Sequence, residues 1–478
     1  MYKVKLYQYL IPLGICLAVV SCAPANVPLA ENKTVPESFD TSKGTDTTNT
    51  STTPWRTYFK DPNLVNLIDI ALKNNQELLI TIQEIEIARN DIRVKKGLLL
   101  PSVGIGAGAG IEKVGRYTSQ GAGDASTEIK PGKEMPDPLS DFKLAAYAHW
   151  EVDIWKKLHN SKKAAVSRYL STVEGKNFVI TNLISEVANS YYELLALDSQ
   201  LEIVRKNIEL QSNALEVVKI QKEAARTTEL AVQKFQAEVL ASKSMEFDIL
   251  QNIKETENKI NFLLGQYPQE IKRDKSNFMD LMPSVVNSGI PSQLLANRPD
   301  IKQAELELEA AKLDVEVARA EFYPSLDITA AIGVNAFKPS LLFTMPESLL
   351  YSLAGEIAAP LINRNAIKAE YSSANARQLQ VLYNYERTIL NAYLEVSSQL
   401  SKINNLEKSY DLKSQKVVAL NRSIDVSGDL FKSAKVDYFE VLMTQRDALE
   451  SKLELIDTKK EQLNASVLVY RDLGGGWK

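Results

Sequence analysis

The chain has 478 residues and a formal net charge of −4, with 56 basic and 60 acidic side chains. This mildly acidic balance argues against nucleic acid as a partner, because nucleic-acid binding needs clustered positive charge. The chain has two cysteines, Cys16 and Cys22, and the first lies in a predicted signal segment. We therefore expect no disulfide in the processed protein.

Residues 1–21 form a predicted signal peptide. Lys3 and Lys5 precede a short apolar stretch that cannot span a bilayer as a helix. Small residues then lead to Cys22, a pattern that resembles the bacterial lipobox, in which the cysteine is acylated; the alternative is an ordinary export signal with an incidental cysteine. We predict a lipid anchor at Cys22.

Residues 22–54 are rich in Thr, Ser, Asn and Pro, which predicts a flexible tether.

The sequence contains an internal repeat. Residues 74–111 align with residues 297–334 at a constant offset of 223, without a gap. Each copy changes, at a Pro-Ser pair, from a helical pattern to alternating small and apolar residues. The chain therefore divides into two similar halves. The predicted segments are a first half over 55–264, a linker over 265–296, a second half over 297–473 and a tail over 474–478.

Four segments show the period-two alternation of strands. Their predicted ranges are about 102–112, 141–155, 325–337 and 348–362. Each is near the length that a tilted strand needs to cross a bilayer, and aromatic side chains lie near the ends. These aromatic residues are Tyr147, Trp150, Trp155, Phe322, Tyr323 and Tyr351. The loop over 113–140 is rich in Gly, Pro, Ser and charge, as a long outer loop would be.

The number of predicted strands constrains any membrane-spanning arrangement. The smallest membrane barrels have eight strands, so four strands cannot close one. An open sheet edge cannot face lipid, because each unpaired backbone group there costs several kcal/mol. If these strands cross a membrane, the protein must be an oligomer in which each chain contributes four strands.

Two stretches of more than 100 residues, 159–264 and 365–473, contain no proline and one glycine each. Apolar residues of the first recur at alternating steps of four and three, the repeat of coiled coils. Ser190 and Gln211 are polar exceptions to this repeat. We predict two antiparallel helical hairpins, turning near 224–230 and near 426–428, with arms of roughly 60–80 Å.

The remaining motifs favour structural roles. The pattern Gly104-x-Gly106-x-x-Ala109 matches the sequence of a dinucleotide-binding motif. No helix is predicted after it, so we expect small residues on a strand face and no dinucleotide binding. His149 and His159 have no neighbouring cysteine and no matched carboxylate cluster in the sequence. The charged run over 452–460 is expected to be a solvated helix face. We expect no catalytic residue, no cofactor and no metal site.

Three groups of residues carry a family resemblance. They are an opening motif with Trp55, Tyr58, Phe59, Asp61, Pro62 and Leu64, a central run with Asn297, Arg298, Pro299, Asp300, Ile301, Phe322, Tyr323, Pro324 and Ser325, and a closing motif with Tyr470, Arg471, Asp472, Leu473, Gly474, Gly475, Gly476 and Trp477. With these motifs the chain resembles the TolC-like outer-membrane efflux family, in its lipoprotein (NodT-like) branch, over about residues 55–477.

The resemblance implies a mixed α and β membrane protein. In that family a homotrimer forms a 12-stranded outer-membrane β-barrel, with four strands per chain, continued by a long α-helical coiled-coil barrel in the periplasm. The implied role is a passive gated exit duct of a proton-driven tripartite efflux pump for drugs or metal ions, and not an enzyme. The implied partners are a periplasmic adaptor, an inner-membrane transporter and outer-membrane lipid.

The resemblance also places a closed periplasmic aperture beside the hairpin turns. The matching residues here are Val232, Phe235, Gln236, Asp437, Phe439, Met443 and Arg446. Many relatives carry an acidic residue at the position of Met443, so a Phe and Met constriction is expected here instead of an acidic ring. The alternative is that these side chains are ordinary core between helices. We expect Arg446 to pair with an acidic residue across helices.

Two other functions are compatible with the sequence. One is the exit duct of an ATP-driven protein secretion system. The other is a lipid-tethered periplasmic coiled-coil scaffold without a pore, which the alternating strands and their duplication disfavour.

Overall fold

The computed structural model describes residues 36, 38, 39, 48–275, 278–284, 287–362, 364–433 and 435–477. The predicted signal peptide and Cys22 lie outside the described residues. The chain divides into two compact units. The strand unit comprises residues 86–169 and 306–382, and the hairpin unit comprises the described parts of 31–85, 170–305 and 383–478.

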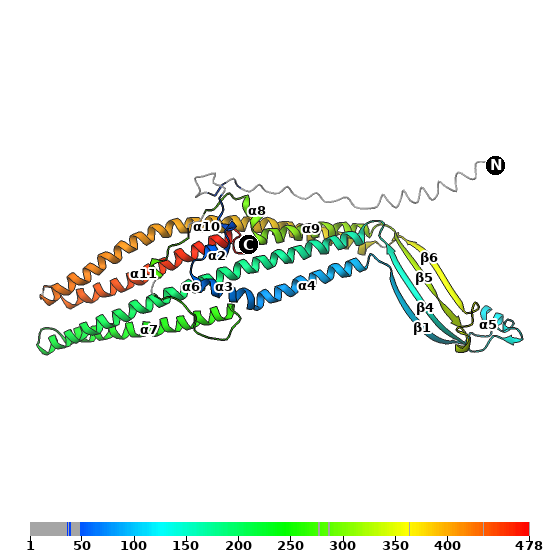
Figure 1. Cartoon of the computed structure of the whole chain (residues 1–478), viewed down its shortest axis with the longest axis horizontal. Helices are drawn as coiled ribbons and strands as arrows, with labels where there is room; N and C mark the ends of the chain where they lie inside the picture. The colour runs from blue at the N-terminus through cyan, green and yellow to red at the C-terminus, as the bar shows by residue number, and fades with distance from the viewer. Residues whose placement is uncertain are drawn as a thin grey trace. The chain divides into compact units, whose positions relative to one another are not determined.

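The strand unit contains one four-stranded sheet in the order β1-β4-β5-β6, and every neighbouring pair is antiparallel (Figure 1). The strands are β1 (Ser102–Glu112), β4 (Leu139–Val152), β5 (Ser325–Ala336) and β6 (Leu349–Ala358). The connection from β1 to β4 holds α5 (Ser119–Asp124) and a small ribbon of β2 (Glu128–Lys130) and β3 (Lys133–Glu134). The shorter connection from β5 to β6 contains η3 (Pro339–Leu341).

Two strands end earlier than the alternation predicts. β4 stops at Val152 because the carboxylate of Asp153 accepts hydrogen bonds from the backbone N–H groups of Leu158 (3.0 Å) and His159 (2.8 Å), which starts the next helix. Trp155 therefore lies at the junction, where its ring stacks on Tyr323 at 4.7 Å. β6 ends before Pro360, which has no N–H to donate to a ladder.

The internal repeat is confirmed. α4 (Gln76–Gly97) and α9 (Pro299–Ala320) each have 22 residues, and both ends of α9 lie 223 positions after those of α4. Each helix is followed by a strand that begins at the serine of the Pro-Ser pair, because proline cannot continue the helix.

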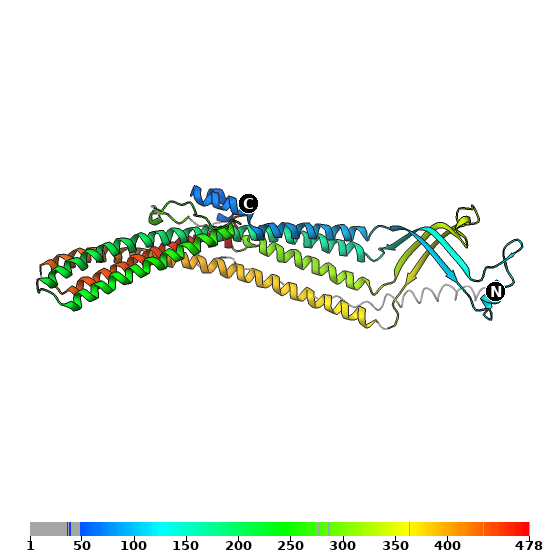
Figure 2. The same cartoon turned by 90° about the horizontal axis from the view of Figure 1, so that it is seen from below.

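The hairpin unit contains most of two helical hairpins, whose longer helices begin in the strand unit (Figure 2). The first consists of α6 (Lys157–Glu223) and α7 (Glu229–Leu263), and the second of α10 (Asn365–Lys432) and α11 (Tyr438–Asp472). The returning helices α7 and α11 have 35 residues each, or about 52 Å, which is shorter than predicted. Within the described ranges, every helix is too short or too polar to cross a membrane.

The predicted position of the second turn is wrong. The sequence places it near residues 426–428, but α10 continues to Lys432. One glycine costs a helix only about 1 kcal/mol, and the space around Gly428 is open. The helix ends instead where the N–H of Lys435 bonds to the carbonyl of Leu430 at 2.9 Å, just before Asp437 caps α11.

The end of the predicted flexible tether is ordered. η1 (Thr50–Thr52) precedes α2 (Trp55–Tyr58) and α3 (Pro62–Asn74). Asn49 donates a side-chain hydrogen bond to Gln293 (3.1 Å), and the N–H of Thr50 bonds to the carbonyl of Asn287 (3.0 Å). This segment is therefore fastened to the linker between the two halves, which also contains η2 (Phe278–Asp280) and α8 (Gln293–Asn297).

The opening and closing motifs meet in the core of the hairpin unit. The rings of Tyr58 and Tyr470 stack at 4.1 Å, and the hydroxyl of Tyr470 donates to the carbonyl of Thr53 at 2.6 Å. The hydroxyl of Tyr191 on α6 donates to Asp61 at 2.6 Å. A Cβ at Gly475 would lie 2.4 Å from the ring of Tyr470, so only glycine fits there.

Candidate functional site

The register of the sheet places apolar side chains on one face of all four strands. Ile105 lies opposite Ala146, which lies opposite Ile332, which lies opposite Tyr351. Alternate residues of every strand continue this row of side chains. The face consists of Val103, Ile105, Ala107, Ala109 and Ile111 on β1, Phe142, Leu144, Ala146, Ala148, Trp150 and Val152 on β4, Leu326, Ile328, Ala330, Ile332 and Val334 on β5, and Leu349, Tyr351, Leu353, Gly355 and Ile357 on β6.

Much of this apolar face is exposed, although Val334 is buried and its side chains on β4 are half-buried. The exposed fraction is 82% for Ile105, 62% for Ile332, 77% for Tyr351 and 79% for Leu353. An uncovered apolar face of this size would be unstable in water but suits contact with lipid.

The opposite face of the sheet is mostly small or polar, with Leu139, Tyr147 and Leu350 as larger residues. On β1 it presents Gly104 and Gly106, so the dinucleotide-like glycines lie on a strand face, as the sequence predicts. The ring of His149 on β4 lies 3.8 Å from the carboxylate of Asp327 on β5. In the strand register, Asp327 lies opposite Glu356 of β6. A sheet with one apolar and one polar face matches a membrane barrel wall with lipid outside and water inside.

Both outer strands leave a backbone edge unpaired. Within the described residues, β1 pairs only with β4 and β6 pairs only with β5. Each edge strand therefore offers a free row of N–H and C=O groups that another strand can bind.

The first hairpin turn combines a helix stop with a helix start. At the end of α6, the N–H of Arg226 bonds to the carbonyl of Gln221 (2.8 Å) and the N–H of Ala225 to that of Lys222 (2.9 Å). This is a Schellman motif, with Ala225 at a left-handed φ of 56°. Thr228 then caps α7 by accepting a hydrogen bond from the N–H of Ala231. Thr228 corresponds to Asp437 of the second turn, 209 residues later.

Val232 and Phe235 are core residues. Their exposed fractions are 7% and 1%, and they pack in a cluster with Leu442 of α11. The structure thus gives these two predicted aperture residues the alternative role, as core between helices. In this arrangement the two side chains face the core between helices.

The other aperture candidates lie nearer the surface. Phe439 is 48% exposed, Met443 is half-buried and Gln236 is exposed. Asp437 caps α11 by accepting a hydrogen bond from the N–H of Tyr438 at 2.6 Å. Among the described residues, the acidic neighbour of Arg446 is Asp447 on its own helix, at 3.9 Å, and the predicted pairing across helices stays a prediction.

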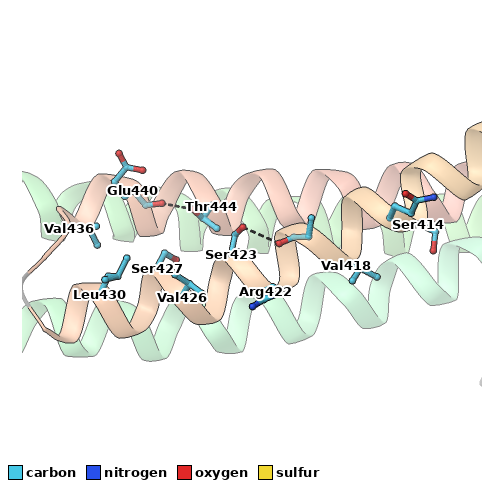
Figure 3. A pocket seen from close by; sticks show the side chains of 12 residues that line it. Ser414, Val418, Arg422, Ser423, Val426, Ser427, Leu430, Val436, Glu440 and Thr444 are labelled. Carbon is cyan, nitrogen blue, oxygen red and sulfur yellow. Dashed lines mark hydrogen bonds between the residues drawn. The ribbon is translucent and has the colours of Figure 1, made fainter.

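Two features of the turns were not identified from the sequence. Leu230, which is 59% exposed, corresponds to Phe439 at the offset of 209, so aligning the two turns could have revealed it. The second hairpin also has a groove of about 720 Å³ between α10 and α11 (Figure 3). Its lining includes Val418, Val426, Leu430 and Val436 together with small polar residues. No sequence pattern pointed to this groove, because both helices contribute to it.

A comparison with protein families decides the identity of this fold. The outer membrane efflux protein family matches residues 67–266 and 290–475, most of the chain. The chain belongs to the outer membrane efflux protein family.

Whole-length relatives agree with this assignment. The efflux protein is 28% identical over 467 residues to the pyoverdine export outer membrane protein OpmQ of Pseudomonas aeruginosa, covering 98% of this chain and 96% of OpmQ. It is 26% identical over 472 residues to the cation efflux system protein CusC of Escherichia coli O6:H1. That alignment covers 98% of this chain and 99% of CusC. The open-state MtrE outer membrane channel of Neisseria gonorrhoeae has the same fold, with a TM-score of 0.82 at 22% identity over 96% of this chain and 99% of MtrE.

This efflux protein is therefore an outer-membrane protein with the fold of outer-membrane efflux channels. The predicted recognition, the mixed α and β fold class and the outer-membrane location are confirmed.

The charged run on α11 is not a uniformly solvated face. Lys459 is 4% exposed, with its ammonium 5.1 Å from the centre of the Tyr410 ring. Burial lowers the pKa of Lys459, and the nearby charge of Asp280 opposes this shift. The neighbouring Lys460 lies 3.1 Å from Glu193. The prediction fails because α11 packs against several helices, so its seam has little access to water.

Each histidine has an aspartate neighbour that the sequence did not predict. The ring of His159 lies 2.6 Å from Asp153, the capping residue of α6. Across the described ranges, no group of three or more His, Cys, Asp or Glu side chains could hold a metal ion.

Proposed function

We propose that three copies of this efflux protein close a 12-stranded barrel in the outer membrane and form the passive exit duct of a tripartite pump. The observation that carries the proposal is the sheet, with its exposed apolar face, its polar face and its two free edges. Pairing β1 of one copy with β6 of the next satisfies both edges and leaves no unpaired backbone toward lipid. The number three comes from the family resemblance.

The helical hairpins provide surfaces on which neighbouring copies can pack. Val418 and Val426 in the groove of the second hairpin are 68% and 50% exposed. Leu240 and Phe247 on α7 of the first hairpin are 58% and 70% exposed. Each hairpin therefore leaves an apolar strip that a second copy would cover, and this favours a ring of hairpins.

Gating is proposed to occur at the hairpin turns. The exposed residues Leu230 and Phe439 and the half-buried Met443 would narrow the duct, and Arg446 would help to hold it closed. A periplasmic adaptor that docks at these turns would part the helices, and a proton-driven inner-membrane transporter would supply the energy. Apolar constrictions close a pore by excluding water.

The proposed cargo is a small molecule or a metal ion. The names of OpmQ and CusC describe pyoverdine export and cation efflux, respectively. The proposal for this chain stays at that breadth, because the transporter selects the cargo. The proposed lipid anchor is Cys22, and its substitution by alanine should abolish incorporation of labelled palmitate.

A matched pair of substitutions on β6 tests the duct. Leu353 lies on the apolar face and Ser352 lies on the polar face. Leu353→Lys should block trimer formation and insertion, because a lysine facing the middle of the bilayer costs about 2–4 kcal/mol. Ser352→Lys should form trimers that conduct in planar bilayers. A wild-type protein that is monomeric in detergent, or equal behaviour of the two variants, would contradict the duct.

The gate is tested separately by single-channel conductance. Phe439→Ala and Arg446→Ala trimers should conduct more often than wild type. If neither variant differs from wild type, the assignment of the aperture is wrong while the duct itself can still stand.

A further inference from the structure

One side of α11 faces the first hairpin. Leu442, Gln445 and Leu449 follow one another at steps of three and four residues, the spacing of a coiled-coil seam. Leu442 packs with residues of both helices of that hairpin, such as Val218 of α6 and Phe235 of α7. Leu449 packs with Leu201 and Ile249 of the same hairpin. Gln445 is therefore a polar residue between two apolar layers of one interface.

The amide oxygen of Gln445 has no hydrogen-bond partner within the described part of the chain. The side chain is 6% exposed, and its Oε1 atom is buried without a donor among the residues that the structure describes. The neighbouring Thr444 bonds to the carbonyl of Glu440 on its own helix. Arg446 is exposed and lies next to Asp447. Neither neighbour supplies a donor to Gln445.

Gln211 shows that a buried glutamine in this fold can be satisfied. It lies in the first hairpin and is 2% exposed, and its Oε1 accepts a hydrogen bond from Ser242 at 2.8 Å. A buried acceptor without a donor loses its bonds to water and regains nothing. The packed contact between α11 and the first hairpin is therefore less stable by the free energy of the unsatisfied oxygen of Gln445. This free-energy cost disappears when water reaches the Gln445 side chain.

We propose that Gln445 is a positioning residue that weakens the packed contact between α11 and the first hairpin, and so sets how readily the duct opens. In the packed arrangement its amide oxygen is unsatisfied, and in a parted arrangement it is hydrated. A single polar residue in a coiled-coil seam is known to reduce stability while fixing the register. This inference rests on the proposed gated conduction.

Two substitutions shift the balance in opposite directions. Gln445→Leu removes the unsatisfied oxygen and fills the seam, so the open probability should fall about tenfold, which corresponds to about 1.4 kcal/mol. Gln445→Glu keeps the shape but buries a carboxylate, so the open probability should rise at pH 8. At pH 5 it should return toward wild type, because burial raises the pKa of a carboxyl and its protonated form is neutral.

The experiment records single-channel opening of full-length trimers in planar bilayers at pH 8 and pH 5. Thermal unfolding of the same samples is followed in parallel. Gln251→Leu is the control, since Gln251 is exposed on α7 and its amide donates to Glu255 of the same helix at 2.9 Å. Its opening should match that of wild type at both values of pH.

The expected result is a higher unfolding temperature and rarer opening for Gln445→Leu, with pH-dependent opening only for Gln445→Glu. A lower unfolding temperature for Gln445→Leu would show that the amide has a donor in the trimer and would overturn the inference. Unchanged opening of both Gln445 variants in conducting trimers would overturn it too. Wild-type trimers that do not conduct would overturn the proposed duct. Conducting wild-type trimers with unchanged Gln445 variants would overturn only the role of Gln445.

Discussion

The hydroxyl of Ser242 donates a hydrogen bond of 2.8 Å to the amide oxygen of Gln211, joining α7 to α6 inside the first hairpin. Gln211 is one of the two polar exceptions in the coiled-coil repeat of the sequence. Its position in the core is tolerated because its acceptor is satisfied, and Asn207 donates a further bond of 3.2 Å to Ser242.

This pair gives the first prediction. Ser242→Ala should lower the free energy of unfolding by about 1–3 kcal/mol, because it leaves a buried amide oxygen without a donor. Adding Gln211→Leu should recover most of the loss, since an apolar side chain needs no partner there. Denaturation in detergent, followed by helical circular dichroism, measures both variants. Equal stability of Ser242→Ala and wild type would contradict the buried hydrogen bond.

The second prediction concerns Arg273, which fastens the linker to the first hairpin. Its guanidinium bonds to Asp198 of α6 (3.0 Å) and Glu257 of α7 (2.7 Å), and its side chain is 2% exposed. Arg273→Met should cost about 3–5 kcal/mol, because it removes the cation between two buried carboxylates and leaves Glu257, within the described residues, with only Lys254, at 3.9 Å. Arg205→Met, which breaks the more exposed pair with Glu246, should cost less than about 1 kcal/mol. Denaturant titrations measure the free energy of unfolding of both variants. A similar loss of stability in both would contradict the prediction that the buried ion pairs contribute more than the exposed one.

The third prediction compares two adjacent lysines. Lys459 is buried without an ion pair among the described residues, and its pKa is lowered by burial. Its charged form at pH 7 therefore opposes folding, and this cost disappears as the pH rises through its lowered pKa. Lys459→Met should raise the free energy of unfolding at pH 7 by about 1 kcal/mol. The gain should shrink by pH 10, as thermal unfolding at the two values of pH can show.

Lys460 is the control for this measurement. Burial alone would lower its pKa, but the charges of Glu193 and Asp457 outweigh burial, and the pKa of Lys460 is raised. The stability that Lys460 contributes is therefore present at pH 7 and is lost as the pH rises through its raised pKa. Lys460→Met should lower stability at pH 7. Loss of stability in both methionine variants would mean that Lys459 is paired in the assembled protein.

The fourth prediction concerns the first hairpin turn. Ala225 has a φ of 56°, a conformation that costs a residue with a Cβ about 1–2 kcal/mol. Ala225→Gly should therefore raise the unfolding temperature. Ala224→Gly should lower it or leave it unchanged, because Ala224 does not have a positive φ. Destabilisation by Ala225→Gly would show that the turn adopts another conformation in the assembled protein.

Local patterns were sufficient for much of the fold. The offset of 223 between the two copies is reproduced at both ends of helices α4 and α9, because the same short-range signals act in both. The Pro-Ser pairs mark the start of β1 and β5 because proline ends a helix wherever it occurs. The strands were overestimated only where a neighbouring feature intervened, such as the cap at Asp153 or the proline at 360.

The second turn and the site residues depended on more than local pattern. Gly428 looked like a turn but lies inside α10, because the cost of one glycine is smaller than the gain from continuing a long packed helix. Phe235 and Phe439 looked alike as apolar residues near a turn. Packing buries the first to 1% exposure and leaves the second 48% exposed.

The sequence by itself determined the repeat, the four strands and the two hairpins, because these follow from periodicity, proline and glycine, which act over a few residues. Only the tertiary structure decided which side chains face the core, which edges of the sheet stay free and which buried polar atoms find a partner. Those properties depend on contacts between segments far apart in the chain, such as Leu442 with Phe235, and no short-range pattern specifies them.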